Sequence, residues 1–217
     1  AVYMEGALHD PSGKMGEGVL RYSQNPITCV IDSTHAGQVV QAHLSPSKSV
    51  PVVRTVQDAI ELGAEVLVLG LAVSGGAIPD EWYAPIDSAI AGGLSVVNGL
   101  HDHLAPRYPN LGVGQFVWDV RQEPSGLTVG MGRAAKLANR RVLFVGTDMA
   151  VGKMTAGLEI YAQAIAQGVS TGFVATGQIG IVVTGAGIAL DAIRVDFAAG
   201  AVEAEVLQFA TKDLVLI

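Results

Sequence analysis

A glycine-rich segment in the second half of the chain constrains the fold more than any other feature. It runs from Gly146 to Thr155 with the sequence GTDMAVGKMT, and it directly follows the apolar run RVLFV at 141–145. A helical pattern extends from position 153 to about position 167. A strand, a glycine-rich loop and a lysine at the start of a helix are the layout of a phosphate-binding loop, or P-loop.

The chemistry of such a loop comes largely from its backbone. The first N–H groups of a helix have no partner within the helix, and the helix dipole adds partial positive charge at the same end. Glycine lets the backbone approach a ligand closely, and a lysine adds a point charge. The sequence therefore predicts phosphate contacts from Gly146, Thr147, Asp148, Ala150, Val151, Gly152, Lys153, Met154 and Thr155.

The loop departs from the usual pattern at two places. Five residues rather than four separate Gly146 from the Gly152-Lys153 pair, and Met154 stands where Ser or Thr normally follows the lysine. That hydroxyl usually holds the Mg²⁺ that bridges nucleotide phosphates. Thr155 comes one place later, about 100° further round the helix. Phosphate binding is thus predicted, whereas a role for Mg²⁺ stays open.

Composition excludes several classes of protein. Half of the 217 residues are apolar and 15% are charged, which is enough for one large or two small cores. The net charge is −7 and no run of Lys and Arg occurs, so we expect no nucleic-acid partner. No apolar run approaches the length of a membrane span, so no membrane partner is expected. Cys29 is the only cysteine, which favours a reducing cytoplasm.

The first half of the chain alternates between strand-like and helix-like segments. Such alternation predicts a parallel sheet covered by helices, here a Rossmann-like α/β domain over residues 1–125. The expected strands are 2–4, 27–31, 50–54, 65–70, 94–98 and 116–120, and the expected helices are 14–22, 55–62 and 80–91.

The second half begins after a turn-rich, basic stretch. We interpret residues 126–140 as a linker and residues 141–217 as an α/β domain of the P-loop NTPase type. A strand at 170–175, a helix at 197–210 and a strand at 213–217 follow the P-loop unit. Because the chain opens and closes inside apparent strands, we expect a truncated second domain that lacks its C-terminal part, and a homo-oligomer.

Polar residues that follow predicted strands are candidate ligand contacts, because open α/β sheets bind ligands at the carboxyl ends of their strands. Ser33, Thr176 and Gln178 are the candidate substrate contacts, although the last two also suit a plain strand-to-helix turn. His101 and Asp102 are candidates for a catalytic base or a substrate contact, and Asp148 for a helix cap or a group that orients an amine. A metal site at His101, Asp102 and His103 is not favoured.

Five stretches together carry a resemblance to one known family: GEGVLRY at 16–22, DSTHAG at 32–37, GLHD at 99–102, GTDMAVGKMT at 146–155 and ATGQIG at 175–180. The chain resembles a two-domain family, long labelled a domain of unknown function, with a Rossmann-like N-terminal half and a P-loop C-terminal half. The family includes D-glutamate N-acetyltransferases. The resemblance implies transfer of an acetyl group from acetyl-CoA, as co-substrate, to the amine of an amino acid such as D-glutamate.

Two other functions stay open at this point. The loop is also similar to that of dethiobiotin synthetases, which share Gly-Thr-Asp and the spacing but have Thr directly after the lysine. An ATP-dependent ligase or kinase is therefore one alternative, and a non-catalytic nucleotide-binding protein is another. All three readings predict small-molecule partners, namely an amino acid together with an acyl-CoA or a nucleotide.

Overall fold

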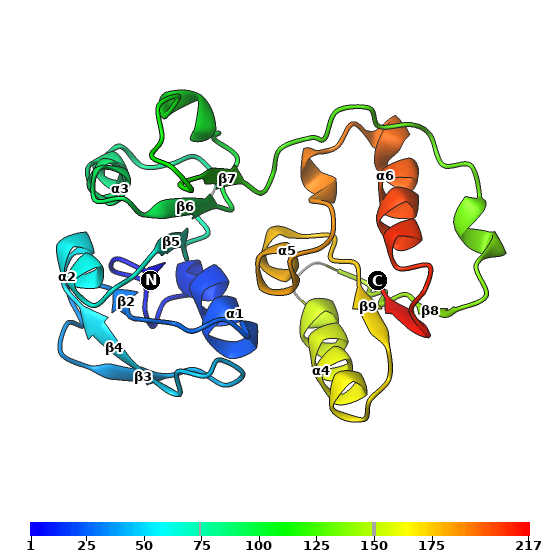
Figure 1. Cartoon of the computed structure of the whole chain (residues 1–217), viewed down its shortest axis with the longest axis horizontal. Coiled ribbons are helices and arrows are strands. Elements are labelled where there is room, and N and C mark those ends of the chain that lie inside the picture. The colour runs from blue at the N-terminus through cyan, green and yellow to red at the C-terminus, as the bar shows by residue number, and fades with distance from the viewer. Residues whose placement is uncertain (74, 149–150) are drawn as a thin grey trace. The chain divides into compact units, whose positions relative to one another are not determined.

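The chain folds into two units, Ala1–Arg121 and Gln122–Ile217. The computed structural model describes residues 1–73, 75–148 and 151–217 (Figure 1). Residues 126–140, which the sequence suggested as a linker, lie within the second unit. Each unit has its own sheet and its own buried apolar core.

The first unit is built on a seven-stranded sheet in the order β3-β4-β2-β1-β5-β6-β7. Only the β3–β4 pair is antiparallel. Counted along the chain, the six parallel strands have the order 3-2-1-4-5-6 of the Rossmann fold. The strands are β1 Val2–Tyr3, β2 Val30–Ile31, β3 Val39–Gln41, β4 Ser49–Val53, β5 Val66–Leu69, β6 Ser95–Asn98 and β7 Val117–Asp119.

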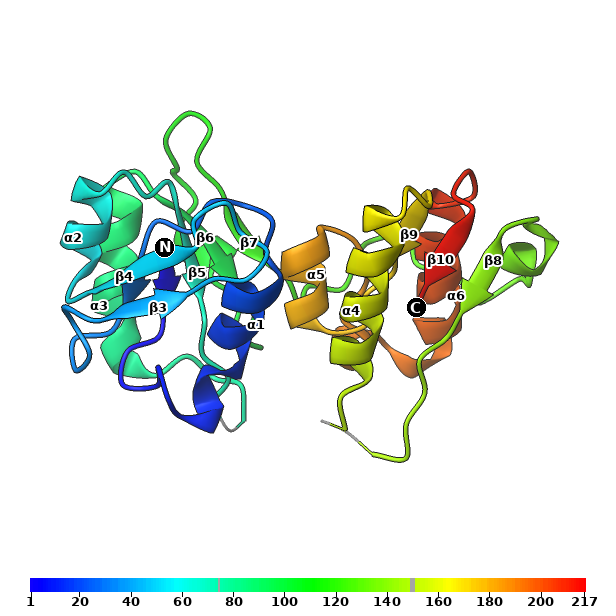
Figure 2. The ribbon, with the colours of Figure 1, turned by 90° about the horizontal axis from the view of Figure 1, so that it is seen from below.

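Three helices cover this sheet: α1 Lys14–Tyr22, α2 Val56–Glu61 and α3 Asp80–Ala91. Helices α2 and α3 contact each other on one face, and α1 lies on the other face (Figures 1 and 2). The helix bounds expected at 14–22 and 80–91 are confirmed. The Rossmann-like architecture expected from the alternating pattern is therefore present.

Helix α1 packs closely against the end of β5 because Gly16 faces it. The N–H of Gly16 donates to the carbonyl of Gly70 at 2.7 Å. A Cβ added at Gly16 would lie 2.4 Å from the sulfur of Met4, well inside van der Waals contact. Any side chain at Gly16 would push α1 away from the start of the chain and from the strand end at Gly70.

The second unit contains a three-stranded parallel sheet in the order β8-β10-β9. Its strands are β8 Arg140–Val142, β9 Thr171–Phe173 and β10 Leu214–Leu216, and its helices are α4 Lys153–Ala166, α5 Gln178–Thr184 and α6 Val195–Gln208. Short 3₁₀ turns lie at Arg133–Lys136 and Leu190–Ala192 in this unit, and at Pro11–Gly13 and Ala105–Arg107 in the first unit. This is the α/β arrangement expected for a P-loop domain.

Helices α4 and α6 cover opposite faces of this small sheet. The ring of Phe173 lies 5.5 Å from that of Tyr161 on α4. Val174, the next residue, instead packs with Val206 of α6 and Val215 of β10. Because successive side chains of an extended segment point to opposite faces, the two helices must lie on different sides.

A single glutamate fastens the segment that precedes β8. Glu203 of α6 is only 7% exposed, and it accepts hydrogen bonds from the N–H groups of Met131 and Ala134. The guanidinium of Arg133 lies 3.2 Å from the same carboxylate. Residues 131–134 are therefore held against α6 by one buried charge.

None of the helices in the described parts of the chain combines the length and the apolar composition needed to cross a membrane.

Candidate functional site

The glycine-rich loop joins β8 to α4, as the sequence predicted. Helix α4 begins at Lys153, and Gly152 occupies its N-cap position with φ +93°, a left-handed conformation that favours glycine. The ammonium of Lys153 donates to the carbonyl of Asp148. A Cβ at Gly146 would lie 3.0 Å from Cδ of Lys153, so the lysine stem lies directly over that glycine.

The sequence named nine phosphate-contact residues, and the structure describes eight of them, since Ala150 lies outside the described residues. The exposed loop residues Thr147 and Asp148 come before the gap, and the exposed Val151 follows it. Thr155 is half-buried in the first turn of α4.

A pocket with a volume of about 200 Å³ opens beside this loop. Lys153 and Met154 line it from α4, Phe144 follows β8, and Thr176 follows β9. The pocket thus lies at the carboxyl ends of the strands, where open α/β sheets bind ligands. Residues that are more than twenty positions apart in the chain, Lys153 and Thr176, share its wall.

The two candidate contacts after β9 have different positions. Thr176 is exposed and lines the pocket, and its carbonyl accepts from the N–H of Leu190 at 3.2 Å. Gln178 is instead the first residue of α5, after the N-cap Gly177. The sequence suggested a turn here, and the helix that begins at Gln178 was missed.

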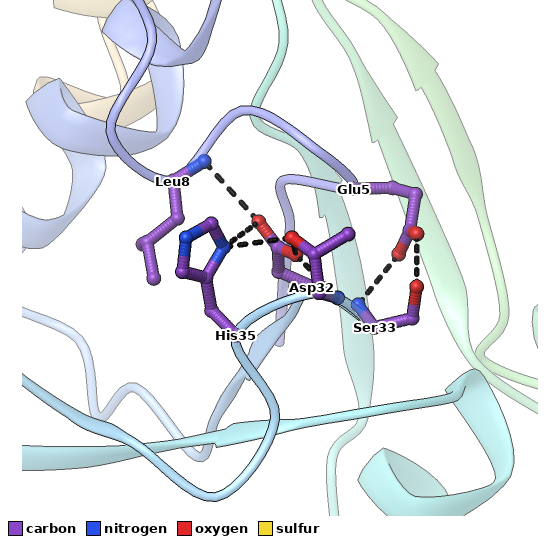
Figure 3. A network of polar contacts seen from close by, with 6 residues as sticks. Glu5, Leu8, Asp32, Ser33 and His35 are labelled. Carbon is purple, nitrogen blue, oxygen red and sulfur yellow. Dashed lines mark hydrogen bonds and ion pairs between the residues drawn. The ribbon is translucent and has the colours of Figure 1, made fainter.

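The carboxyl end of β2 carries a buried carboxylate, Asp32, in the first unit. Asp32 is fully buried, and it accepts from the N–H of Leu8 at 3.2 Å and of Thr34 at 2.9 Å (Figure 3). Nδ1 of His35 lies 3.1 Å from the same carboxylate. Burial by itself raises the pKa of Asp32, but these hydrogen bonds from Thr34, His35 and Leu8 outweigh it and hold the pKa below its usual value.

Ser33, a predicted substrate contact, donates hydrogen bonds to Glu5, an acidic residue that follows the neighbouring strand β1. Its N–H donates to Glu5 at 2.8 Å, and its hydroxyl donates to the other oxygen of the same carboxylate (Figure 3). Glu5 follows β1 as Asp32 follows β2, so both lie at the carboxyl edge of the sheet. Glu5 is not among the residues predicted from the sequence, and its place after a predicted strand is the signal that could have identified it.

His101 and Asp102 lie in the loop after β6. The carboxylate of Asp102 accepts from the N–H of Ile78 at 2.8 Å, and Nε2 of His101 contacts the guanidinium of Arg121. Both side chains are exposed. Each therefore has a bracing contact within the first unit, and a catalytic role for either stays a prediction.

A buried pair near these residues holds the same loop in place. Asp119, at the end of β7, accepts from the amide of Asn98 at 2.8 Å and from the N–H groups of Leu104 and Ala105. Within the described residues, no three His, Cys, Asp or Glu side chains gather as they would around a metal ion.

The comparisons with known proteins agree with this architecture. A Rossmann-like unit followed by a unit with a P-loop defines a class of two-domain α/β proteins. Residues 33–123 match the domain described as "Domain of unknown function (DUF1611_N) Rossmann-like domain", and residues 128–217 match "Domain of unknown function (DUF1611_C) P-loop domain". The chain belongs to the DUF1611 family.

Several individual relatives are similar to this chain. A protein named D-glutamate N-acetyltransferase from a Pseudoalteromonas species is 37% identical over 67% of the chain, and one of the same name from Tritonibacter scottomollicae is 38% identical over 69%. The chain spans 45% of the length of each. The crystal structure of a DUF1611 family protein from Anabaena variabilis superposes with a TM-score of 0.89 at 44% identity, over 99% of this chain and 64% of that one.

Proposed function

We propose that the protein is an N-acetyltransferase that moves an acetyl group from acetyl-CoA to the amine of an amino acid, with D-glutamate as the acceptor. In this proposal the P-loop holds the phosphates of coenzyme A. The observation that carries it concerns two neighbouring residues in the wall of one pocket. Lys153 supplies a cation for phosphate, and the thioether of Met154 stands where a P-loop normally has the hydroxyl of Ser or Thr. The names of the two curated relatives support the same activity.

The residue after the lysine supports coenzyme A over a Mg²⁺-bound nucleotide as the phosphate ligand. Mg²⁺ prefers oxygen ligands, and the thioether of Met154 is a poor substitute for the usual hydroxyl. The residues present therefore do not fit the usual Mg²⁺ site. Coenzyme A carries a pyrophosphate and has no γ-phosphate to transfer. A loop that grips phosphates through backbone N–H groups and one ammonium suits such a ligand.

The reaction requires two further groups. An amino acid carries an ammonium near neutral pH, and only the neutral amine attacks a thioester, so a base must accept a proton. The amine nitrogen attacks the thioester carbonyl, so the C–N bond forms first and the carbonyl oxygen becomes an oxyanion. The C–S bond then breaks as that oxygen re-forms the carbonyl, and coenzyme A leaves as a thiol. Of the two protons that the ammonium loses, one goes to the sulfur and one passes to solvent. N–H donors must stabilise the tetrahedral oxyanion in between. Asp148, His101 and Asp102 are our candidates for the base.

Thr176 and Gln178 are proposed as ligand contacts on the strength of their place after β9. Thr176 has the stronger support, because it shares the pocket wall with Lys153. Ser33 is proposed as a substrate contact in the first unit, where it is joined to Glu5. We also propose that the protein acts in the cytoplasm and as a homo-oligomer.

A nucleotide-binding protein without acyltransferase activity is the competing proposal. The description of residues 128–217 as a P-loop domain favours it, because such loops commonly bind ATP or GTP. An ATP-dependent ligase would need Mg²⁺ ligands from elsewhere in the protein.

Ligand binding followed by turnover separates these proposals. Thermal shifts of the protein are measured with acetyl-CoA, coenzyme A, MgATP and MgGTP. Thiol release from acetyl-CoA is then followed with a panel of D- and L-amino acids. We expect stabilisation by acetyl-CoA and coenzyme A, and thiol release that depends on the amino acid. Strong stabilisation by MgATP, with no thiol release from acetyl-CoA in the presence of any amino acid of the panel, would reject the acetyltransferase.

A further inference from the structure

A second pocket, of about 320 Å³, opens in the first unit at the carboxyl edge of its sheet. Tyr3 and Glu5 line it from the end of β1, Arg54 from the end of β4, and Ser88 from α3. Its volume lies at the lower end of the range of small-molecule sites, which is about 300–1,000 Å³. Unlike the pocket beside the P-loop, its wall carries side chains of both charges.

The negative group in this pocket is held in a fixed orientation. Both oxygens of Glu5 accept from Ser33, one from its N–H at 2.8 Å and one from its hydroxyl (Figure 3). A carboxylate offers about four acceptor positions, so two remain for a ligand. The position of Glu5 is thus set in advance, while its capacity to accept an ammonium group is retained.

Tyr3 also lines this pocket, and its side chain carries a hydroxyl group that can donate a hydrogen bond. Burial, above all, together with the nearby carboxylates of Glu5, Glu81 and Asp32, raises the pKa of Tyr3 to about 12. The phenol therefore keeps its proton at neutral pH. Its ring is fixed by an edge-to-face contact with Trp82, with ring centroids 5.9 Å apart.

The positive group in the pocket is the exposed Arg54, which follows β4. Asp58 is its charged neighbour on α2, and the capping interaction with Thr55 already engages that carboxylate. A guanidinium binds a carboxylate with two parallel N–H donors, whereas it offers nothing to an ammonium. The pocket therefore has separate partners for the two ends of a zwitterion.

The neighbouring acidic residue argues against a dinucleotide in this unit. In Rossmann-type sites an acidic residue after the second strand binds a ribose hydroxyl. Here that residue is Asp32, whose buried oxygens already accept from Leu8, Thr34 and His35. A ligand at this edge must use other groups, and Glu5 and Arg54 are the charged groups that line the pocket.

We propose that this pocket binds an α-amino acid, with its ammonium on Glu5, a carboxylate on Arg54 and a further hydrogen bond from the hydroxyl of Tyr3. The identity of the bound amino acid as the acetyl acceptor rests on the proposed function. The binding itself does not, because the pocket is formed wholly by residues of the first unit.

Binding of two ligands without acetyl-CoA tests the pocket. Isothermal titration with D-glutamate and with glutarate, which has the same two carboxylates and no amine, is done on the full chain and on Glu5→Gln and Arg54→Gln. We expect Glu5→Gln to weaken D-glutamate about tenfold and to leave glutarate unchanged. Arg54→Gln should weaken both ligands about tenfold. Glu17→Gln and Arg21→Gln, at exposed positions of α1, are the matched controls.

Each outcome bears on one proposal. Glu5→Gln keeps an acceptor for the N–H of Ser33, so it should fold, and circular dichroism checks this. Unchanged D-glutamate affinity in both variants, or no binding of D-glutamate by the native chain, overturns the pocket. Selective loss of D-glutamate binding alongside absent acetyl transfer would keep the pocket and reject the acetyltransferase. Acetyl transfer with an unchanged KM for the amino acid in both variants would keep the acetyltransferase and reject this pocket as its amino-acid site.

Discussion

Nδ1 of His35 lies 3.1 Å from Oδ2 of the buried Asp32, and this contact sets the tautomer of the histidine. The hydroxyl of Thr34 donates to Oδ1 of Asp32 at 2.6 Å, so its oxygen can only accept from Nδ1 of His35, 2.8 Å away. Nδ1 therefore carries a proton, and Nε2 is the acceptor of the neutral ring. The edge-to-face contact with His9, with ring centroids 5.0 Å apart, fixes the ring further.

Replacement of Asp32 by Asn should change how stability depends on pH. The pKa of Asp32 is lowered in the folded state, so its charge stabilises the fold above the unfolded pKa of about 4, and this contribution is lost as the pH falls through the lower folded value. Urea unfolding of both proteins should show a difference that is constant above about pH 5 and shrinks at lower pH. A difference that grows on acidification would contradict this assignment.

Two glutamates on α6 should respond in opposite ways to removal of their charge. The N–H of Met131, above all, lowers the pKa of Glu203, whereas burial raises the pKa of Glu205. At pH 7 we expect Glu203→Gln to lower the urea midpoint of unfolding. Glu205→Gln should leave it unchanged or raise it, since Gln still accepts from Gly187. Equal losses in both variants would be inconsistent with this view of the segment at 131–134.

Gly180 should tolerate no side chain because α5 packs tightly on the strand end. A Cβ there would lie 2.7 Å from Cβ of Ala175. Gly180→Ala should therefore destabilise the second unit by about 1–3 kcal/mol, the usual cost of overpacking. Gly177→Ser is the control, because no atom lies within 4 Å of a Cβ at that N-cap position. Chemical denaturation measures both, and a neutral Gly180→Ala would show that α5 can shift.

Met154→Thr should restore the hydroxyl that normally follows the lysine of a P-loop. A threonine hydroxyl after the lysine adds the missing oxygen ligand for Mg²⁺. We expect binding of ATP to become stronger in the presence of Mg²⁺ in this variant, and to depend little on Mg²⁺ in the native chain. Titration of ATP with and without Mg²⁺ is the measurement. A native chain that already requires Mg²⁺ would contradict our view of Met154.

Much of the fold was predictable because local patterns agreed with the tertiary structure. The helices expected at 14–22 and 80–91 have the same bounds in the structure. The missed strand β3, Val39–Gln41, has one half-buried residue between two exposed ones, so its pattern is weak and its pairing with β4 decides it. Helix α5 was missed because it has only seven residues and follows a turn-like Thr-Gly pair.

The candidate sites also differ in whether a local sequence pattern or a long-range contact determines them. The presence of Lys153 and Thr176 in one pocket wall was predictable, because strand ends of a parallel sheet lie at one edge. The contact of Ser33 with Glu5 joins residues 28 positions apart. Each residue follows a predicted strand, but the local pattern does not show that these two side chains meet. The hydrogen bond from the N–H of Leu8 to Asp32 likewise depends on how the loop after β1 folds back.

Binding of acetyl-CoA to the native chain and to Lys153→Ala tests the central claim most directly. Lys136, an exposed lysine of the same unit, provides the control variant Lys136→Ala. We predict that Lys153→Ala weakens acetyl-CoA and coenzyme A alike by about tenfold or more, with an intact fold, while the control binds as the native chain does. Unchanged acetyl-CoA affinity in Lys153→Ala would contradict the account.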